Sequence, residues 1–242
     1  DPRKIAMLLP LLVADYGFIV EECAFALDTD KWTTAVTAGG GPTAFAYSAV
    51  RGGVFQGATG ATDNDATAIR ATNTFLDPDD NPFFIISFSV TAVTGFQFEC
   101  GMSDPKTDEA LPAVTDVDTP TVGNGVTDVV CVHMDTDQTL TTAELVGDGT
   151  TGAAVLSSGP TLTSAALTPS VADTYITLVI GVRDNLGYAL IFDGERQVGS
   201  FAVANGPDGG VLIRPYALFR TRNTTSKTIN IRYCAIGFER NG

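Results

Sequence analysis

The single histidine of the chain lies in a run where every second residue carries a possible metal ligand. His133, Asp135 and Asp137 follow one another at intervals of two, and successive side chains of a β-strand point to opposite faces of the sheet. The three side chains therefore share a face, where imidazole and carboxylate groups suit several divalent ions. A solvent-facing strand end that runs into a turn explains the same pattern. We favour this second interpretation and predict no metal site and no cofactor.

Paired carboxylates are the other chemistry to consider, because glycoside hydrolysis places two of them about 5–10 Å apart across the scissile bond. No strand-like stretch carries a Glu-x-Asp-x-(x)-Glu spacing. Glu21 and Glu22 follow an apolar run, and Glu99, Asp104 and Glu109 straddle a turn. Catalysis through histidine would have to use the only one present. We therefore predict no catalytic residues and no enzymatic activity.

Three further motifs have an ordinary structural explanation. Residues 63–65 and 77–80 have the composition of calcium-binding loops but lack the full twelve-residue pattern. Trp32, the only tryptophan, could stack on a sugar, although a lone tryptophan is more often an anchor in the core. Asn223-Thr224-Thr225 is a glycosylation acceptor only in a secreted eukaryotic protein.

The charge of the chain is unevenly distributed. Net charge is −14, and 16 of the 28 acidic but only 2 of the 14 basic residues lie between Asp63 and Asp148. Nucleic-acid binding needs clustered Lys and Arg, so we predict no nucleic-acid partner. Hydrophobic residues make up 44% and charged residues 17%, which is the balance of a globular chain with a sizeable core.

Four cysteines are widely spaced and form no C-x-x-C pair. Cys23, Cys131 and Cys234 have apolar or aromatic neighbours. Buried free thiols are the best interpretation and favour assembly in a reducing cytoplasm, with long-range disulfides in a secreted protein as the alternative.

The N-terminal segment begins with two basic residues and an apolar run over 5–14. This run imitates a secretory signal and is too short to span a membrane. We interpret residues 1–30 as an apolar arm that buries itself on its own core or on a neighbouring subunit. Residues 31–242 would form one domain, with a possible loop insertion at 147–172, and we predict no membrane partner.

Strand patterns separated by turn residues recur along the rest of the chain. Residues 174–183 alternate with Ile176, Leu178, Ile180 and Val182 on one face. Asp184-Asn185-Leu186-Gly187 predicts a turn, and Asp193-Gly194 predicts a hairpin between 188–192 and 196–203. Strands at such spacing are typical of an all-β, two-sheet antiparallel sandwich.

The C-terminal third resembles a known family. The phrase Ala189-Leu190-Ile191-Phe192-Asp193-Gly194-Glu195-Arg196, a Pro-Tyr strand and the closing Ile231-Arg232-Tyr233-Cys234 stretch look like the laminin-G or concanavalin-like jelly roll. The resemblance covers residues 174–238 and implies a jelly-roll sandwich, an architecture found among lectins and glycoside hydrolases.

A second phrase, Gly149-Thr150-Thr151-Gly152 followed by residues 153–163, is similar to one common in bacteriophage tail and fibre proteins. The two likenesses together imply a phage structural protein with a jelly-roll domain, located on the virion and assembled in the host cytoplasm. Our first hypothesis is a homo-oligomeric capsid decoration protein that binds the major capsid protein or tail proteins. The alternatives are a receptor-binding, lectin-like fibre protein that binds a host glycan, and a secreted polysaccharide-active enzyme.

Overall fold

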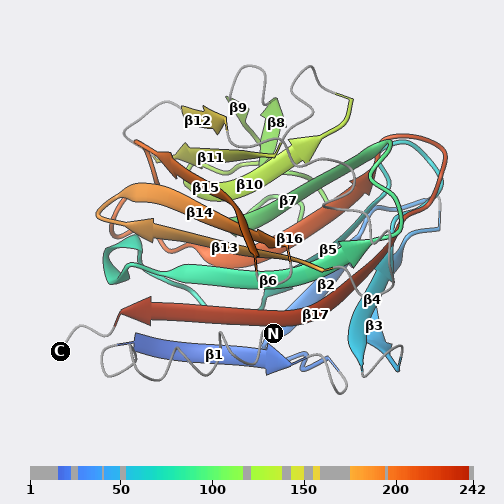
Figure 1. Ribbon diagram of the computed structural model, residues 1–242, viewed down its shortest axis with the longest axis horizontal. Helices are drawn as coiled ribbons and strands as arrows, with labels where there is room; N and C mark the ends of the chain where they lie inside the picture. Colours follow the sequence, from blue (N-terminus) through green and yellow to red (C-terminus); the bar gives the residue numbers. More distant parts are fainter. Residues whose placement is uncertain are drawn as a thin grey trace.

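Two large antiparallel sheets make up the protein (Figure 1). The computed structural model describes residues 16–22, 27–39, 41–49, 53–116, 121–137, 143–149, 155–158, 175–193 and 196–239. Within these ranges the helical structure is one 3₁₀ turn, η4 (Pro78–Asp80). Both sheets pair their strands antiparallel, so the predicted all-β sandwich is confirmed.

Sheet A has the order β15-β14-β13-β6-β17-β4-β3, with β1 paired to β17. The long β17 pairs β4 over its first half and β1 over its second half, so β1 extends the sheet beside β4. The bounds are β1 (Tyr16–Glu22), β3 (Thr43–Ser48), β4 (Val54–Ala58), β6 (Phe83–Val90), β13 (Ile176–Arg183), β14 (Leu186–Asp193), β15 (Arg196–Val203) and β17 (Thr228–Glu239).

Sheet B has the order β12-β11-β10-β7-β16-β5-β2, and β8 with β9 forms a separate two-stranded sheet. The central strand β7 comes from the middle of the sequence and lies between β10 and the late strand β16. The bounds are β2 (Trp32–Val36), β5 (Ala66–Ala71), β7 (Phe96–Ser103), β8 (Val114–Asp116), β9 (Thr121–Val122), β10 (Val129–Asp135), β11 (Glu144–Asp148), β12 (Val155–Ser158) and β16 (Arg214–Thr221).

The alternation of β13 appears in the structure as predicted. Ile176, Leu178, Ile180 and Val182 are buried between the sheets. Asp184 and Asn185 both have positive φ angles, 52° and 62°, and join β13 to β14 as a two-residue hairpin loop. Such loops match the twist of the flanking strands, so the predicted turn sits where two sheet A strands reverse.

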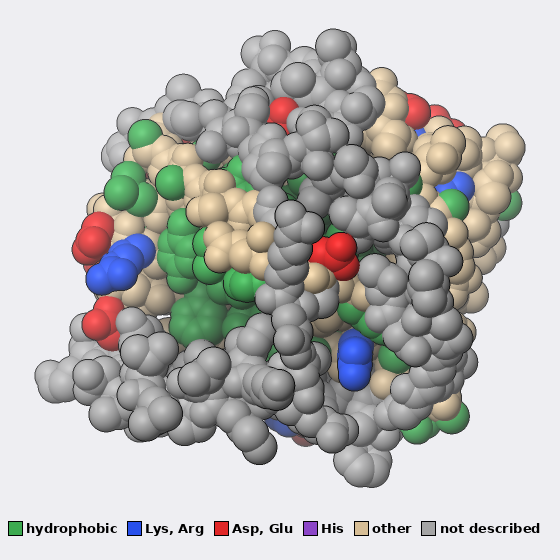
Figure 2. Space-filling view, viewed as in Figure 1, with side chains coloured by type: hydrophobic (Ala, Val, Ile, Leu, Met, Phe, Trp, Pro, Cys, Tyr) green, Lys and Arg blue, Asp and Glu red, His purple; other side chains and the backbone are tan. Residues whose placement is uncertain are grey.

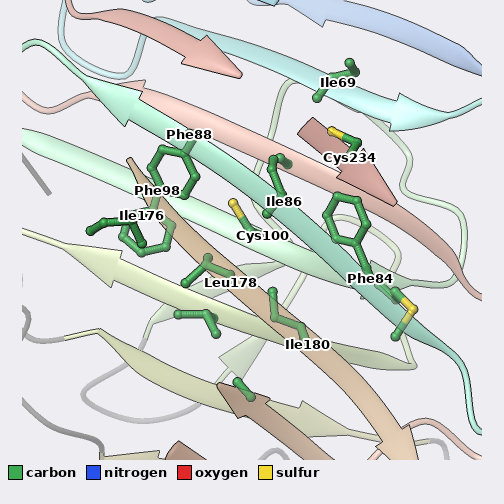
Figure 3. Packing of buried hydrophobic residues seen from close by; sticks show 14 of the residues in the cluster. Ile69, Phe84, Ile86, Phe88, Phe98, Cys100, Ile176, Leu178, Ile180 and Cys234 are labelled. Atoms are coloured by element: carbon green, nitrogen blue, oxygen red, sulfur yellow. The ribbon is translucent and has the colours of Figure 1, made fainter. Parts of the chain in front are cut away.

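The main core fills the space between the sheets with aromatic and branched side chains (Figure 3). Phe88 of sheet A lies 5.0 Å from Phe219 and 5.5 Å from Phe98 of sheet B, measured between ring centroids. Tilted and edge-on rings at this spacing add a specific attraction to the burial of apolar area. Cys100 and Cys234 also belong to this core.

A third layer covers part of sheet B on its outer side. Residues 104–116 and 121–128, which we call the covering segment, include β8 and β9. They pack against outward-facing residues of β10, β11 and β16 in a second apolar cluster, whose buried members are Ala113, Val114, Val126, Val129, Cys131, Val146 and Tyr216. Polar side chains on this part of the outer face of sheet B are therefore buried beneath the covering segment.

The outer face of sheet A is partly apolar. Phe83, Val179, Tyr188 and Leu190 are half-buried there. In the space-filling view, hydrophobic side chains gather in a hollow on the face that carries β13, β14 and β17 in Figure 1, with acidic and basic side chains at its margin (Figure 2).

Several sequence-based predictions can be compared with this fold. Residues 16–22, assigned to the N-terminal arm, form a strand along β17; residues 1–15 and most of 147–172 lie outside the described residues, so both domain assignments stay predictions. Cys100, Cys131 and Cys234 are buried thiols, while Cys23 lies outside the described part. No helix among the described residues is long and apolar enough to cross a membrane.

Candidate functional site

Glu99 lies at the centre of a buried polar network on the outer face of sheet B. Its position on β7 pairs with His133 on β10 and with Leu218 on β16. The Glu99 carboxylate accepts hydrogen bonds from the main-chain N–H groups of Ala113 (2.7 Å) and Val114 (2.8 Å). These two bonds connect sheet B to the covering segment.

Three side chains complete the surroundings of the Glu99 carboxylate. The Tyr216 hydroxyl donates to Oε1 at 2.6 Å, His133 Nδ1 lies 3.3 Å from Oε2, and Lys106 Nζ lies 3.6 Å from Oε1. The Lys106 ammonium also lies 3.6 Å from the centre of the Tyr216 ring. A buried charge needs such pairing, because an isolated one carries a large desolvation cost.

The network keeps Glu99 ionised. Burial by itself raises the pKa of this carboxyl, but the hydrogen bond from His133 and the positive charges of Lys106 and His133 outweigh it and lower the pKa to about 2. Burial lowers the pKa of Lys106, against the opposing effect of Glu99. A fully enclosed carboxylate with a pKa of about 2 is not poised to donate a proton near neutral pH.

The predicted His133, Asp135 and Asp137 group does share one side of the chain but does not converge on a point. His133 contacts Glu99, whereas Asp135 Oδ1 accepts from Arg222 Nε at 3.1 Å. Asp137 lies beyond the end of β10, with Oδ2 3.6 Å from the same nitrogen. Among the described residues, no group of three or more His, Cys, Asp or Glu side chains is arranged to hold a metal ion.

The other motifs singled out from the sequence serve as local structural contacts. Asn64 Oδ1 accepts hydrogen bonds from Arg220 and Arg222. Asp77 Oδ1 accepts from main-chain N–H groups of residues 79 and 210, and Asn223 Oδ1 accepts from the main-chain N–H of Thr225.

Trp32 faces the core. It is 1% exposed and packs 6.3 Å from the Phe84 ring. The hypothesis that it stacks on a sugar is therefore wrong, because the inward face of β2 leaves no surface for a ligand.

The exposed aromatic ring of Phe75 lies at one end of sheet B, beside a partly buried ion pair. Leu76 and Ile213 form a bridge in which each main-chain N–H donates to the other's carbonyl, at 2.8 and 3.0 Å. Their side chains are buried, so the neighbouring Phe75 and Arg214 project outward. Phe75 is 46% exposed, and the Arg214 guanidinium carbon lies 5.8 Å from its ring centre.

Two arginines meet one carboxylate at this place. Arg214 Nη2 donates to Glu109 Oε1, and Arg70 Nε lies 3.3 Å from the same oxygen. The three side chains are 11% to 23% exposed. Leu111 and Leu212, two residues from Glu109 and Arg214 along the chain, are 39% and 51% exposed. We call these residues, Arg70, Phe75, Glu109, Leu111, Leu212 and Arg214, the rim site.

The rim site combines an exposed apolar surface with charged hydrogen-bonding groups, the two features of a recognition surface. Exposed apolar side chains beside polar ones mark interaction sites, and here the exposed Phe75 ring lies against the Arg214 guanidinium. Burial lowers the pKa of Arg214, the Glu109 carboxylate opposes this change, and the nearby Arg70 adds to it. Planar guanidinium and carboxylate groups beside an aromatic ring can hold a ligand by hydrogen bonds and stacking.

Sequence patterns do not reveal the rim site, because its members are up to 144 residues apart in the chain. One signal was present. Arg70 and Lys106 are the two basic residues within the acidic stretch from 63 to 148, and both approach a glutamate of sheet B or of the covering segment.

Solved structures share this fold at low sequence identity. A protein of unknown function from Shewanella oneidensis MR-1 is 9% identical with a TM-score of 0.60, and the match covers 99% of this chain and 95% of that one. Peanut lectin is 11% identical, with a TM-score of 0.57 over 93% of this chain and 97% of the lectin. A Bacillus licheniformis beta-glucanase is 10% identical, with a TM-score of 0.52 over 95% and 100%.

No family model and no curated protein match the chain. The structural likenesses define the class at the level of the fold: the chain is a jelly-roll sandwich of the concanavalin and legume-lectin kind. The concanavalin-like resemblance predicted from residues 174–238 is thereby confirmed. The bacteriophage origin inferred from residues 149–163 stays a prediction, since nothing in these likenesses indicates it.

Proposed function

We propose that this protein is a non-enzymatic, lectin-like carbohydrate-binding protein, and that the rim site contacts the sugar. The observation that carries the proposal is the 46% exposed Phe75 ring beside the Arg214, Glu109 and Arg70 side chains. An apolar surface with a few convergent polar groups is the usual composition of a small-molecule site. The fold alone would not support a function.

Lectins among the similar structures support the same proposal. Their descriptions include a Bauhinia forficata lectin in complex with GalNAc and the carbohydrate recognition domain of Emp47p, at 11% and 9% identity. At such identities the binding residues do not transfer. The rim site has to be argued from its own chemistry, which offers a stacking surface and charged hydrogen-bonding groups in one place.

The arrangement of Glu99 argues against the hydrolase alternative. Along β7, the outward positions are Gln97, Glu99, Gly101 and Ser103, with one carboxylate among them. Glu99 is 0% exposed beneath the covering segment and already accepts several donors. Glycoside hydrolysis needs a pair of carboxylates that reach the scissile bond, and this one has no access to substrate.

A glycan array followed by calorimetry with the best ligand tests the proposal. Phe75→Ala should weaken binding about tenfold, because loss of an aromatic contact at the centre of a site costs at least ~1 kcal/mol. Tyr47→Ala is the matched control, since Tyr47 is an aromatic residue 44% exposed on sheet A; its affinity should equal that of the wild type. Absence of binding to every glycan contradicts the proposal.

Three earlier predictions remain predictions: that the protein is located on a virion, that it binds a capsid or tail protein, and that it self-associates. The rim site suits a protein partner in one respect, because aromatic and arginine side chains dominate binding energy at protein interfaces. Purified particles analysed by mass spectrometry would locate the protein and give its copy number; its absence from particles would refute the decoration hypothesis.

A further inference from the structure

The charge of the rim site differs from that of the molecule around it. The chain carries −14 overall, yet here two guanidinium groups share one oxygen of Glu109. Glu99, in the separate buried network, is paired with Lys106 and His133. The group formed by Arg70, Arg214 and Glu109 therefore has a net charge of +1.

Arg70 is incompletely satisfied by its surroundings. A guanidinium carries five N–H donors. The Arg70 side chain is 23% exposed, its Nε is enclosed without a hydrogen-bond acceptor, and its contact with Glu109 is an ion pair at 3.3 Å that lacks hydrogen-bond geometry. The enclosed Nε is out of a ligand's reach, but the exposed part of the Arg70 guanidinium, beside a second guanidinium, favours an added anionic acceptor, since charge-assisted hydrogen bonds are about twice as strong as neutral ones.

The shape of the site restricts the kind of anion. Phe75 offers apolar area beside Arg214, so a bare inorganic anion would leave that surface unused. A carboxylate on a pyranose ring would satisfy both parts, with the acid group against the guanidiniums and the ring face on Phe75. The acidic residues next to the site along the chain, Asp77 and Asp108, accept hydrogen bonds from main-chain N–H groups.

We infer that the rim site selects acidic sugars, carrying a hexuronate or similar carboxylate, over neutral sugars of the same shape. This inference rests on the proposed function and names its ligand class. Arg70 is the residue that determines the preference, because Arg214 is the more enclosed of the two and donates to Glu109.

The test uses the full chain on an array that carries hexuronate-containing oligosaccharides beside their carboxyl-reduced counterparts. The acidic member of each pair should bind about tenfold more tightly, as expected for one charge-assisted contact, and its affinity should fall as salt is raised. Arg70→Gln should remove the preference, so that the acidic sugar and its carboxyl-reduced counterpart bind with equal affinity. Arg183→Gln, which alters an exposed arginine on the β13–β14 hairpin, is the control and should keep it.

The outcomes separate the two proposals. Equal binding of acidic and carboxyl-reduced sugars overturns the acidic-sugar inference and leaves the carbohydrate-binding function standing. A preference that persists in Arg70→Gln, with an unchanged thermal melt, overturns the assignment to this site. Binding to an acidic peptide but to no glycan overturns both.

Discussion

Replacing Glu99 with glutamine should destabilise the protein strongly, although the two side chains have nearly the same shape. Glutamine cannot carry the charge that pairs with Lys106, and its NH₂ group would face donors such as the Ala113 and Val114 N–H groups. Removing one partner of a buried ion pair leaves the other charge uncompensated and costs about 3–5 kcal/mol. We expect Glu99→Gln to lose that much free energy of unfolding at pH 7.

The pKa of Glu99 leads to the same magnitude and gives the sign of its pH dependence. The carboxyl has a pKa of 4.5 in an unfolded chain and about 2 in the fold. A lowered folded pKa contributes stability above the unfolded value, here ~3 kcal/mol, and this contribution is lost as pH falls from about 4.5 to 2. The wild type should therefore weaken steeply over this range, and Glu99→Gln should follow a flatter curve.

Urea denaturation at pH 7 and across pH 2 to 5 measures both effects. The double variant Glu99→Gln/Lys106→Met removes both charges and should be at least ~1 kcal/mol more stable than Glu99→Gln alone. Asp184→Asn, at a side chain that is 84% exposed, is the control and should change stability by less than ~0.5 kcal/mol. A Glu99→Gln protein within ~1 kcal/mol of the wild type would refute the network as a source of stability.

Two further variants test the electrostatics and packing elsewhere. Burial and, to a smaller extent, the charges of Asp128 and Asp208 raise the pKa of Asp148 from 3.8 to about 6. An acid whose pKa is raised in the fold contributes stability below pH 3.8, and this contribution is lost as pH rises through 6. The free energy of unfolding of Asp148→Asn should therefore be about 1 kcal/mol higher than that of the wild type at pH 7, after discounting for solvent screening, and the difference should be smaller at pH 4. Urea denaturation at both pH values measures the difference, and an equal difference at both contradicts this prediction. Trp32→Ala should cost about 3–5 kcal/mol by thermal melting, because it empties a core position, and should leave the glycan affinity of the folded protein unchanged. A selective loss of glycan affinity would show that Trp32 acts in binding.

The strands and their buried faces were largely readable from the chain. Ile176, Leu178, Ile180 and Val182 point the same way because strand side chains alternate with a period of two. The loop at Asp184-Asn185 and the β14–β15 hairpin follow from turn residues. These are local properties, since a strand's alternation and a tight turn depend on neighbours a few residues apart.

The chemistry of His133 shows where local reasoning fails. The same alternation correctly placed His133 and Asp135 on one face of β10. It could not tell that Glu99 of the neighbouring strand meets the imidazole, nor that the covering segment buries both. A face that looks solvent-exposed in one strand becomes interior when another part of the chain lies over it.

What the sequence determined by itself, then, is the sandwich and the inward side of its clearest strands, because both arise from periodicity and turn chemistry. Tertiary structure alone decided which polar residues became a buried network and which became a surface. Glu99 meets Tyr216, and Arg70 meets Glu109 and approaches Arg214, through strand pairings that span many tens of residues. Such pairings depend on the sheet order, and no local pattern encodes the order in which distant strands associate.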